Sequence, residues 1–148
     1  MGKTATAADL ALPEGAILLP SDGILAKTAQ DKTVWLISNN QRRGFTSSSV
    51  FTGLGFKFKQ VLIITAPELN KLAIGANLDN PKAAHPEGVD INLNGTIYWV
   101  HNNTLYPYPS LKTYNSWRVP NDFSRVLKAN SADALLPKAE GIKERIVQ

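Results

Sequence analysis

The residue types that most often carry chemistry are sparse in this sequence. Its 148 residues include two histidines, His85 and His101, and no cysteine. Without cysteine there is no thiolate nucleophile, no cysteine-ligated metal and no disulfide. Two isolated imidazoles with no carboxylate at ligand spacing make a poor zinc site, and no G-x-S-x-G nucleophile elbow is present. The sequence therefore predicts a protein that is not an enzyme and that binds no metal and no cofactor.

One short segment resembles the first half of a calcium-binding loop. Residues 90–95 read D-I-N-L-N-G, which fits the pattern D-x-N-x-N-G. Calcium needs several oxygen ligands and normally a bidentate Glu at the twelfth position, where this chain has His101. A single carboxylate supplies too little charge, and Asn94-Gly95 is a strong hairpin signal. We therefore expect a turn here and no calcium.

Aromatic side chains are concentrated in the second half of the chain. Tyr106 and Tyr108 lie two residues apart, so they point to one face of an extended segment, and Pro107 and Pro109 predict that this segment is an edge strand. Exposed rings would suit a sugar, a peptide or a protein surface, because they combine apolar area with a polar group. The alternative is that the rings fill the core. The candidate contact residues are Trp99, Tyr106, Tyr108 and Trp117.

A pair of arginines, Arg42-Arg43, follows a predicted hairpin turn. One hypothesis is contact with an anion or carboxylate. The other, which we favour, is a solvated strand edge that discourages pairing with other chains. The net charge of +4 is modest and no dense basic run occurs, so the sequence argues against nucleic acid as a partner. No stretch approaches the roughly 18 apolar residues that span a membrane.

The elements that position these residues occur twice. Residues 22–75 and 87–141 carry the same landmarks in the same order, at offsets of 63 to 66 residues. The matched landmarks are Trp35 with Trp99, Asn39-Asn40 with Asn102-Asn103, Phe45 with Tyr108, Phe51 with Tyr114, Leu54 with Trp117, and Val61 with Val126.

The pattern of each copy predicts short strands and one or two short helices. In the first copy we expect strands over 24–27, 33–38, 41–45 and 61–65, and a helix after Ser47 that Gly55 ends. In the second we expect strands over 89–93, 96–101, 105–108 and 123–127, with Ser110 and Ser131 as helix caps. The predicted fold class is α+β, with two tandem small modules of mostly antiparallel β-hairpins and short helices. The expected boundaries are a flexible arm over 1–15, one module over 16–78, a linker over 79–86 and a second module over 87–148.

The first copy resembles a family of short repeats. Its segments D-G-I-L-A-K at 22–27, V-W-L-I-S-N-N-Q-R-R-G-F at 34–45 and S-V-F-T-G-L-G-F at 49–56 are similar to tandem modules of uncharacterised secreted and cell-surface bacterial proteins. The second copy is less similar, since Leu105-Tyr106 replaces the arginine pair and Arg118 replaces the glycine. The matching positions are turn and core residues, so the resemblance implies a fold and an extracytoplasmic setting and no chemistry.

These observations predict a non-enzymatic extracellular or cell-surface module that binds or self-assembles, as the subunit of a surface layer, fibre or filament. The expected partners are other copies of the chain, in a homo-oligomer, or a cell-surface polymer. An N-terminal arm that adds a strand to a neighbour would give a head-to-tail contact. One alternative is a carbohydrate- or cell-wall-binding module that uses the exposed aromatics. A second is the accessory domain of a secreted hydrolase. The chain starts without the apolar stretch of a signal peptide, so an exported form would begin after its signal.

Overall fold

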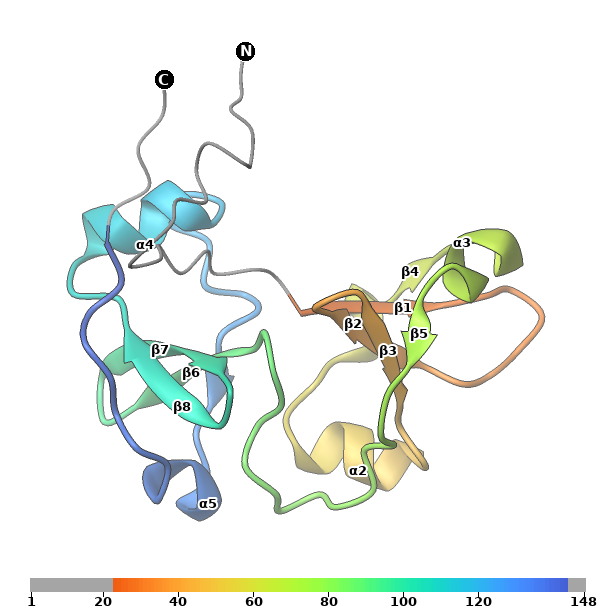
Figure 1. The fold of residues 1–148 in the computed structure, drawn as a ribbon, viewed down its shortest axis with the longest axis horizontal. Coiled ribbons are helices and arrows are strands. Elements are labelled where there is room, and N and C mark those ends of the chain that lie inside the picture. Colours follow the sequence, from red (N-terminus) through yellow and green to blue (C-terminus); the bar gives the residue numbers. More distant parts are fainter. Residues whose placement is uncertain (1–22, 144–148) are drawn as a thin grey trace, which may run out of the picture.

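The computed structural model describes residues 23–143 and contains two small sheets, mostly antiparallel, with short helices beside them (Figure 1). The predicted α+β fold class is therefore confirmed. The expected arm over 1–15, the start of the first module and the tail after Lys143 lie outside the described residues. The first half below means residues 23–78, and the second half means residues 88–143.

The first sheet is a three-stranded meander with one short parallel strand added at each edge. Its strands are β1 (Ile24–Lys27), β2 (Trp35–Ser38), β3 (Gln41–Gly44), β4 (Leu62–Ile63) and β5 (Ala73–Ile74), in the order β4-β1-β2-β3-β5. The turn between β2 and β3 is formed by Asn39 and Asn40, with φ of 53° and 60°. Asparagine tolerates this left-handed conformation better than most residues, which explains the predicted hairpin.

Helices follow the first meander where the capping residues predict them. Helix α2 (Ser48–Gly53) begins at Ser47, whose side chain accepts a hydrogen bond from the Val50 amide, and Gly55 follows with φ of +96°. A 3₁₀ turn, η1 (Phe58–Gln60), follows the helix, and β4 is shorter than the strand expected over 61–65. Helix α3 (Ala66–Asn70) begins with a capping box between Thr65 and Glu68.

The second sheet repeats this plan. Its strands are β6 (Asp90–Leu93), β7 (Thr96–His101), β8 (Thr104–Pro107) and β9 (Leu127–Lys128), in the order β8-β7-β6-β9. Helix α4 (Leu111–Trp117) is capped by Ser110 as predicted. Helix α5 (Ser131–Ala134) is capped by Asn130, which corrects the expectation that Ser131 is the cap. The return strand expected over 123–127 is reduced to β9.

The strand registers match residue by residue between the halves. In each half the added strand pairs in parallel with the first strand of the meander, as Ala26 with Leu62 and Ile91 with Leu127. Lys138 bridges Leu105 in parallel, as Ile74 pairs with Arg42. The two halves therefore share one topology. Their similarity includes the parallel pairings at the sheet edges as well as the predicted hairpins.

The register corrects one of the matched landmarks. Ala26 faces Trp35 and Ile91 faces Tyr98, so Trp35 corresponds to Tyr98, and Leu36 corresponds to Trp99. The Asn-Asn turns fix this register, and a shift of one residue moves a side chain to the opposite face of the sheet. The two tryptophans therefore lie on opposite faces of their sheets.

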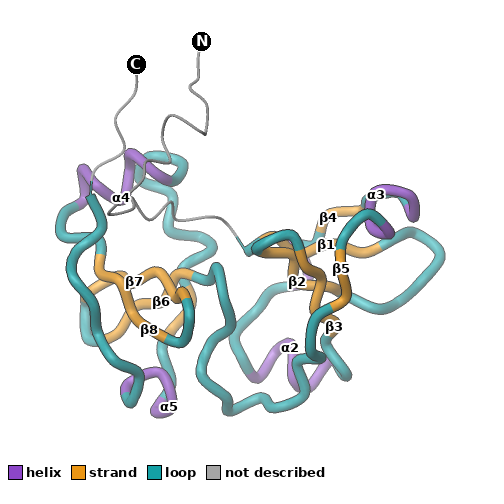
Figure 2. Tube along the Cα trace, in the orientation of Figure 1, coloured by secondary structure: helices purple, strands orange, loops and turns teal. Residues whose placement is uncertain are grey.

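A single apolar core joins the halves. It lies between the side of the first sheet that faces α2 and the side of the second sheet that faces away from α4. Its buried members are Leu25, Val34, Leu36, Phe45, Val50, Phe51, Leu54, Phe56, Leu78, Val89, Ile91, Val100, Leu105 and Leu127. A second cluster lies between the second sheet and α4, and its buried members are Trp99, Tyr108, Tyr114 and Ile142. The tube view shows how short the strands are relative to the loops between them (Figure 2).

Corresponding backbone positions of the halves meet at their seam. The Gly23 amide donates a hydrogen bond of 2.9 Å to the Gly88 carbonyl. Gly88 has φ of +89°, and a Cβ atom there would lie 2.9 Å from the Ser38 Cβ and 3.4 Å from Gly23. Nearby, the Gln60 side chain donates to the Ser124 carbonyl at 2.9 Å. Both the conformation and the close approach require glycine at position 88.

Candidate binding surfaces

The second half contains a buried ion pair where the first half is apolar. The Asp90 carboxylate accepts hydrogen bonds from Arg118, at 2.7 Å from Nε and 3.1 Å from Nη2, and from the Tyr108 hydroxyl at 2.9 Å. Burial and then the negative charge of Asp90 raise the pKa of Tyr108 far above its ordinary value. Tyr108 therefore stays protonated and donates. By the strand register and the shared landmarks, the corresponding residues of the first half are Leu25, Gly55 and Phe45.

This ion pair lines a cleft of about 500 Å³ between the halves. The first half contributes Gly23, Leu25, Phe56 and Gln60 to its walls, and the second half contributes residues from β6, α4 and the following loop. Arg118 and Asp90 are both largely buried, and their contact with each other fixes the C-terminal end of α4 to β6. The cluster thus positions the helix against the sheet.

His85 is locked in a second buried cluster that joins three parts of the chain. Its Nδ1 lies 2.6 Å from Asp133 Oδ2 and its Nε2 lies 2.6 Å from the Leu54 carbonyl oxygen. Both ring nitrogens therefore face an acceptor oxygen. The His85 amide also donates to Asp133, at 2.7 Å. The expected linker over 79–86 is therefore anchored to both halves at its C-terminal end.

The surroundings of Asp133 control its ionisation. Burial acts to raise its pKa, but hydrogen bonds from the His85 ring and from the Asn130 and His85 amides outweigh burial and hold the pKa below its ordinary value. Asp133 occupies the capping-box position that Glu68 holds in the first half. The sequence pattern N-x-x-D at 130–133 is a capping-box signal, and it could have indicated this carboxylate.

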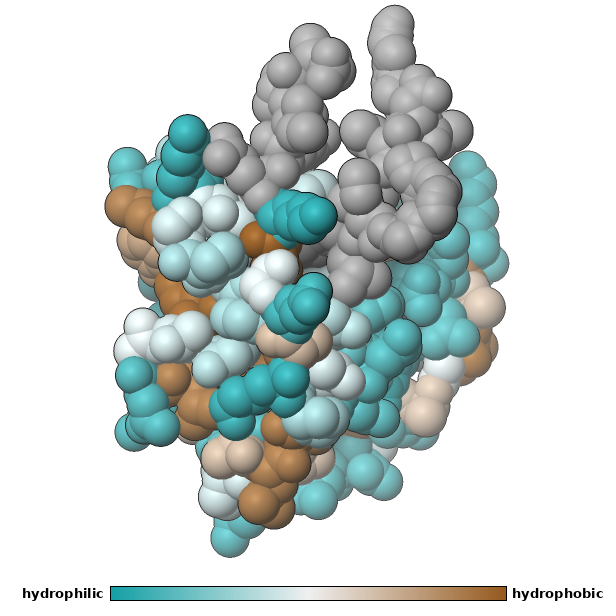
Figure 3. All heavy atoms as spheres, turned by 60° about the vertical axis from the view of Figure 1, so that its left-hand side comes forward, coloured by the Kyte–Doolittle hydropathy of each residue, from teal (hydrophilic) through white to brown (hydrophobic). Residues whose placement is uncertain are grey.

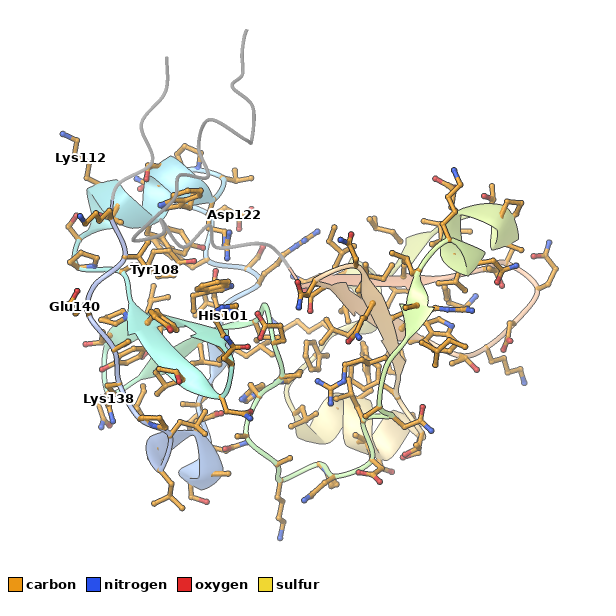
Figure 4. All side chains as sticks on the ribbon, in the orientation of Figure 1. His101, Tyr108, Lys112, Asp122, Lys138 and Glu140 are labelled. Atoms are coloured by element: carbon orange, nitrogen blue, oxygen red, sulfur yellow. The ribbon has the colours of Figure 1, made fainter. Side chains whose placement is uncertain are left out.

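His101 lies at the end of β7 and is paired with Glu87. Its Nδ1 is 2.6 Å from Glu87 Oε2, and its ring stacks on Trp99 at a centroid distance of 4.7 Å. Figure 4 shows His101 at the end of the second sheet nearer the first half, and Tyr108 between this sheet and α4. The expectation that neither histidine has a nearby carboxylate is thus wrong, because the fold brings Asp133 and Glu87 to them. Within residues 23–143, no cluster of three or more metal-ligating side chains occurs.

The candidate aromatics fall into two groups. Trp99 and Tyr108 are buried, with 2% and 6% of their surface exposed, so they are core residues and offer no ring to a ligand. This corrects their place among the contact candidates. Tyr106 and Trp117 are partly buried and pack against the same cluster, and the Trp117 Nε1 donates to the Lys143 carbonyl at 2.8 Å. Tyr106 does share a face with Tyr108 on edge strand β8, as the alternation predicts.

The arginine pair is not a solvated edge. Strand β3 lies inside the first sheet, between β2 and β5, because the two-residue strand β5 covers it. The Arg42 guanidinium stacks on the Trp35 ring at 4.6 Å, and Arg43 Nε donates to the Ala76 carbonyl at 2.9 Å. The Nε atom of Arg42 is buried and has no acceptor among the described residues.

Trp35 and Arg42 belong to an apolar sheet face that the sequence patterns did not predict. Directly paired residues point to the same face. The pairs Ile24–Ile37, Ile37–Arg42 and Arg42–Ile74 form one row, and Trp35 and Leu62 both pair with Ala26 in the next. We name these residues the open face: Ile24, Trp35, Ile37, Arg42, Leu62 and Ile74.

The open face lies on the side of the first sheet away from α2 and outside both buried clusters. Ile24, Trp35, Ile37 and Arg42 are partly buried there. Leu69 of α3, the helix between edge strands β4 and β5, is buried and belongs to neither cluster. Leu62 is 48% exposed and Ile74 is 65% exposed, whereas their neighbour Ala26 is buried. Large apolar side chains at this level of exposure on one sheet are typical of a contact surface. The alternation of apolar residues at 24, 35 and 37 could have indicated it, but only once the registers of β4 and β5 were known.

The second half also exposes apolar side chains. They lie on α4 and the loop after it, as Leu111, Val119 and Phe123, and on α5, as Leu135. When the second half is turned forward, hydrophobic residues interrupt the polar surface in several places (Figure 3). No described helix is long and apolar enough to cross a membrane.

No family model matches the chain, and no curated protein matches it. Among solved structures it is similar to a chain of the periplasmic assembly from the ESX-5 inner membrane complex, with 14% identity and a TM-score of 0.31 over 82% of this chain and 35% of that one. It is also similar to a chain of an intact ESX-5 inner membrane complex, with 16% identity and a TM-score of 0.32 over 86% of this chain and 31% of that one. The protein thus spans about a third of the length of both chains. TM-scores this low carry no argument about the partners or location of this chain.

Proposed function

We propose that this chain is a non-enzymatic assembly module, which acts by protein–protein contact with other copies of itself at a bacterial cell surface. The observation that carries the proposal is the open face. Its exposed apolar side chains, Leu62 and Ile74, lie on the two edge strands, with the partly buried Trp35 and Arg42 between those strands. Tryptophan and arginine are among the residues that contribute most to protein interfaces.

The polar clusters support a structural role over a catalytic one. The rings of His85 and His101 are each held by a carboxylate, and Asp90 is held by Arg118 and Tyr108. Each of these contacts fixes one element to another. A reactive centre normally aims such groups at a substrate position, with a base poised near a nucleophile.

The resemblance of residues 21–75 to modules of secreted and cell-surface bacterial proteins supports a setting at a bacterial surface. A surface layer or fibre is built from repeated contacts between identical subunits, and a duplicated module with an apolar face suits that use.

Sedimentation velocity over a wide range of protein concentration tests the proposal. We expect the average mass to rise with concentration and negative-stain microscopy to show oligomers or polymers. A monomer at every concentration would contradict an assembly role.

Carbohydrate binding is a second candidate, and the partly exposed Trp35 ring, with Arg42 over it, favours it. Sugars stack on open aromatic rings and bind neighbouring polar groups. Titration with cell-wall and storage polysaccharides should then quench tryptophan fluorescence, and Trp35→Ala should abolish the quenching. Trp99→Phe is the matched control, because Trp99 is buried.

A further inference from the structure

We propose that the open face is the docking site for the helix-bearing end of the second half of another copy of this chain. The inference rests on the proposed assembly function and names the surface and the partner. Its basis is that the chain contains the same face twice, once covered and once exposed.

The covered version of the face lies in the second half. The register matches Ile24, Trp35, Ile37, Arg42 and Leu62 with four buried members of the shared core and with Tyr98, which is partly buried and packs against that core. These are Val89, Tyr98, Val100, Leu105 and Leu127. Leu127 is 5% exposed where Leu62 is 48% exposed. The same sheet position is therefore buried in one half and open in the other.

The first half provides the cover for this second-half face. The segment after α2 lies against it: a Cβ atom on Gly55 would lie 3.9 Å from Leu127, and Phe56 belongs to the same buried cluster. The Leu54 carbonyl accepts from His85, and Gln60 donates to Ser124. The surface that covers this sheet face is thus formed by the C-terminal end of α2 and the residues that follow it.

The second half presents the corresponding segment with exposed apolar residues. Trp117 corresponds to Leu54, so Val119 takes the place of Phe56. Val119 is 67% exposed where Phe56 is 8% exposed. Phe123 stacks on Tyr114 as Phe58 stacks on Phe51, and it is 42% exposed. The end of α4 in one copy can therefore cover the open face of another.

Such a contact joins two different patches, so it is heterologous and repeats without closing unless the rotation brings it back to the first copy. Arg42 is the charged residue of the open face, and the corresponding residue of the second half is the buried Leu105. The guanidinium is a hydrogen-bond donor, and a carbonyl at the end of a partner helix would accept from its terminal nitrogens. Arg42 would thereby orient the partner.

The first experiment measures self-association of the whole chain by sedimentation velocity. We expect Leu62→Lys and Trp35→Ala to raise the apparent Kd at least about tenfold, because the first buries a lysine in the contact and the second removes the largest ring of the open face. Leu135→Lys is the matched control: it adds the same charge at an 85% exposed leucine on α5 and should leave the Kd unchanged. Thermal melts confirm that each variant is folded.

The two proposals fail in different ways. If the wild-type chain is monomeric at all concentrations, the assembly function is wrong. If the wild-type chain associates and the two open-face variants associate equally well, the function stands and the docking site is wrong.

A mixing experiment tests the head-to-tail geometry. Leu62→Lys blocks the open face and Val119→Lys blocks the end of α4, so each variant alone should be monomeric. Their mixture should form one-to-one dimers, since each copy keeps one intact patch. If Val119→Lys associates like the wild type, or the mixture stays monomeric, the contact does not join these two patches.

Discussion

Leu25 and Asp90 occupy the same position of two sheets that share strand order and register, yet one is apolar and the other is charged. In the second half Tyr108 and Arg118 contact Asp90, and the corresponding residues of the first half are Phe45 and Gly55. The comparison shows that this site determines how the helix is held to the sheet. Apolar packing holds α2, whereas an ion pair and a hydroxyl hold the end of α4.

The largest effect should follow from breaking this ion pair. Asp90→Leu leaves the buried Arg118 guanidinium without its carboxylate, and we expect a loss of about 4 kcal/mol in the free energy of unfolding. Urea denaturation measures the loss. Asp90→Leu combined with Arg118→Gly and Tyr108→Phe recreates the first half's composition and should recover much of the stability. If the triple variant is no more stable than Asp90→Leu, the two sites are not interchangeable.

The next largest effect should be a difference in stability loss between equivalent substitutions on the covered sheet face and on the open face. Leu127→Ala should cost about 3 kcal/mol, because it leaves a cavity in the shared core. Leu62→Ala, at the corresponding position, should cost well under about 1 kcal/mol, because Leu62 is 48% exposed. Thermal unfolding at a protein concentration low enough to make association negligible measures both losses of stability. Equal losses would mean that the open face is packed within the monomer.

A third effect concerns the capping-box carboxylates Asp133 and Glu68. Asp133→Asn should cost about 2 kcal/mol at neutral pH, because the buried His85 contact loses its charged acceptor. The pKa of Asp133 is lowered in the folded chain, so its stabilisation is complete above the ordinary aspartate range and is lost as the pH falls through the lowered value.

The gap between wild type and Asp133→Asn should therefore narrow in acid, which melts recorded from neutral pH downward would reveal. Glu68→Gln is the control: its carboxylate is also hydrogen bonded and has a lowered pKa, but it is exposed, so its effect should be much smaller at every pH. A gap that stays constant in acid would show that the ionised carboxylate is not what stabilises the joint.

The smallest effect should be the same in both halves. Asn40 and Asn103 hold the second position of their hairpin turns with φ of 60° and 54°. Replacing either by alanine should cost about 1 kcal/mol, since alanine disfavours the left-handed conformation. Denaturation of the two single variants checks this. Unequal costs would indicate that one turn depends on contacts outside its hairpin.

Local signals in the sequence were sufficient to predict the meanders and the helices that follow them. Ser47 and Ser110 cap the predicted helices, and the asparagine turns lie where they were expected. The parallel pairings of β4, β5 and β9 were not predictable in this way. Each involves two residues that meet a strand far away in sequence, so no periodicity marks them.

The candidate site was less predictable than the fold. Alternation placed Tyr106 and Tyr108 on one face, but it could not say that α4 covers that face and buries Tyr108. His85 and Asp133 are 48 residues apart in sequence, and only the packing of the halves brings them together. Contacts of this kind depend on the tertiary arrangement, and no local pattern in a single sequence predicts them.

The backbone contact between Gly23 and Gly88 has a consequence for how far the side chains of the two halves can differ. Because main-chain atoms make this contact, it does not depend on which side chains surround it. Leucine in one half can be matched by aspartate in the other, and phenylalanine by tyrosine, while the glycines keep the two sheets aligned. A joint of this type allows the side chains of one half to change while that half keeps its position beside the other.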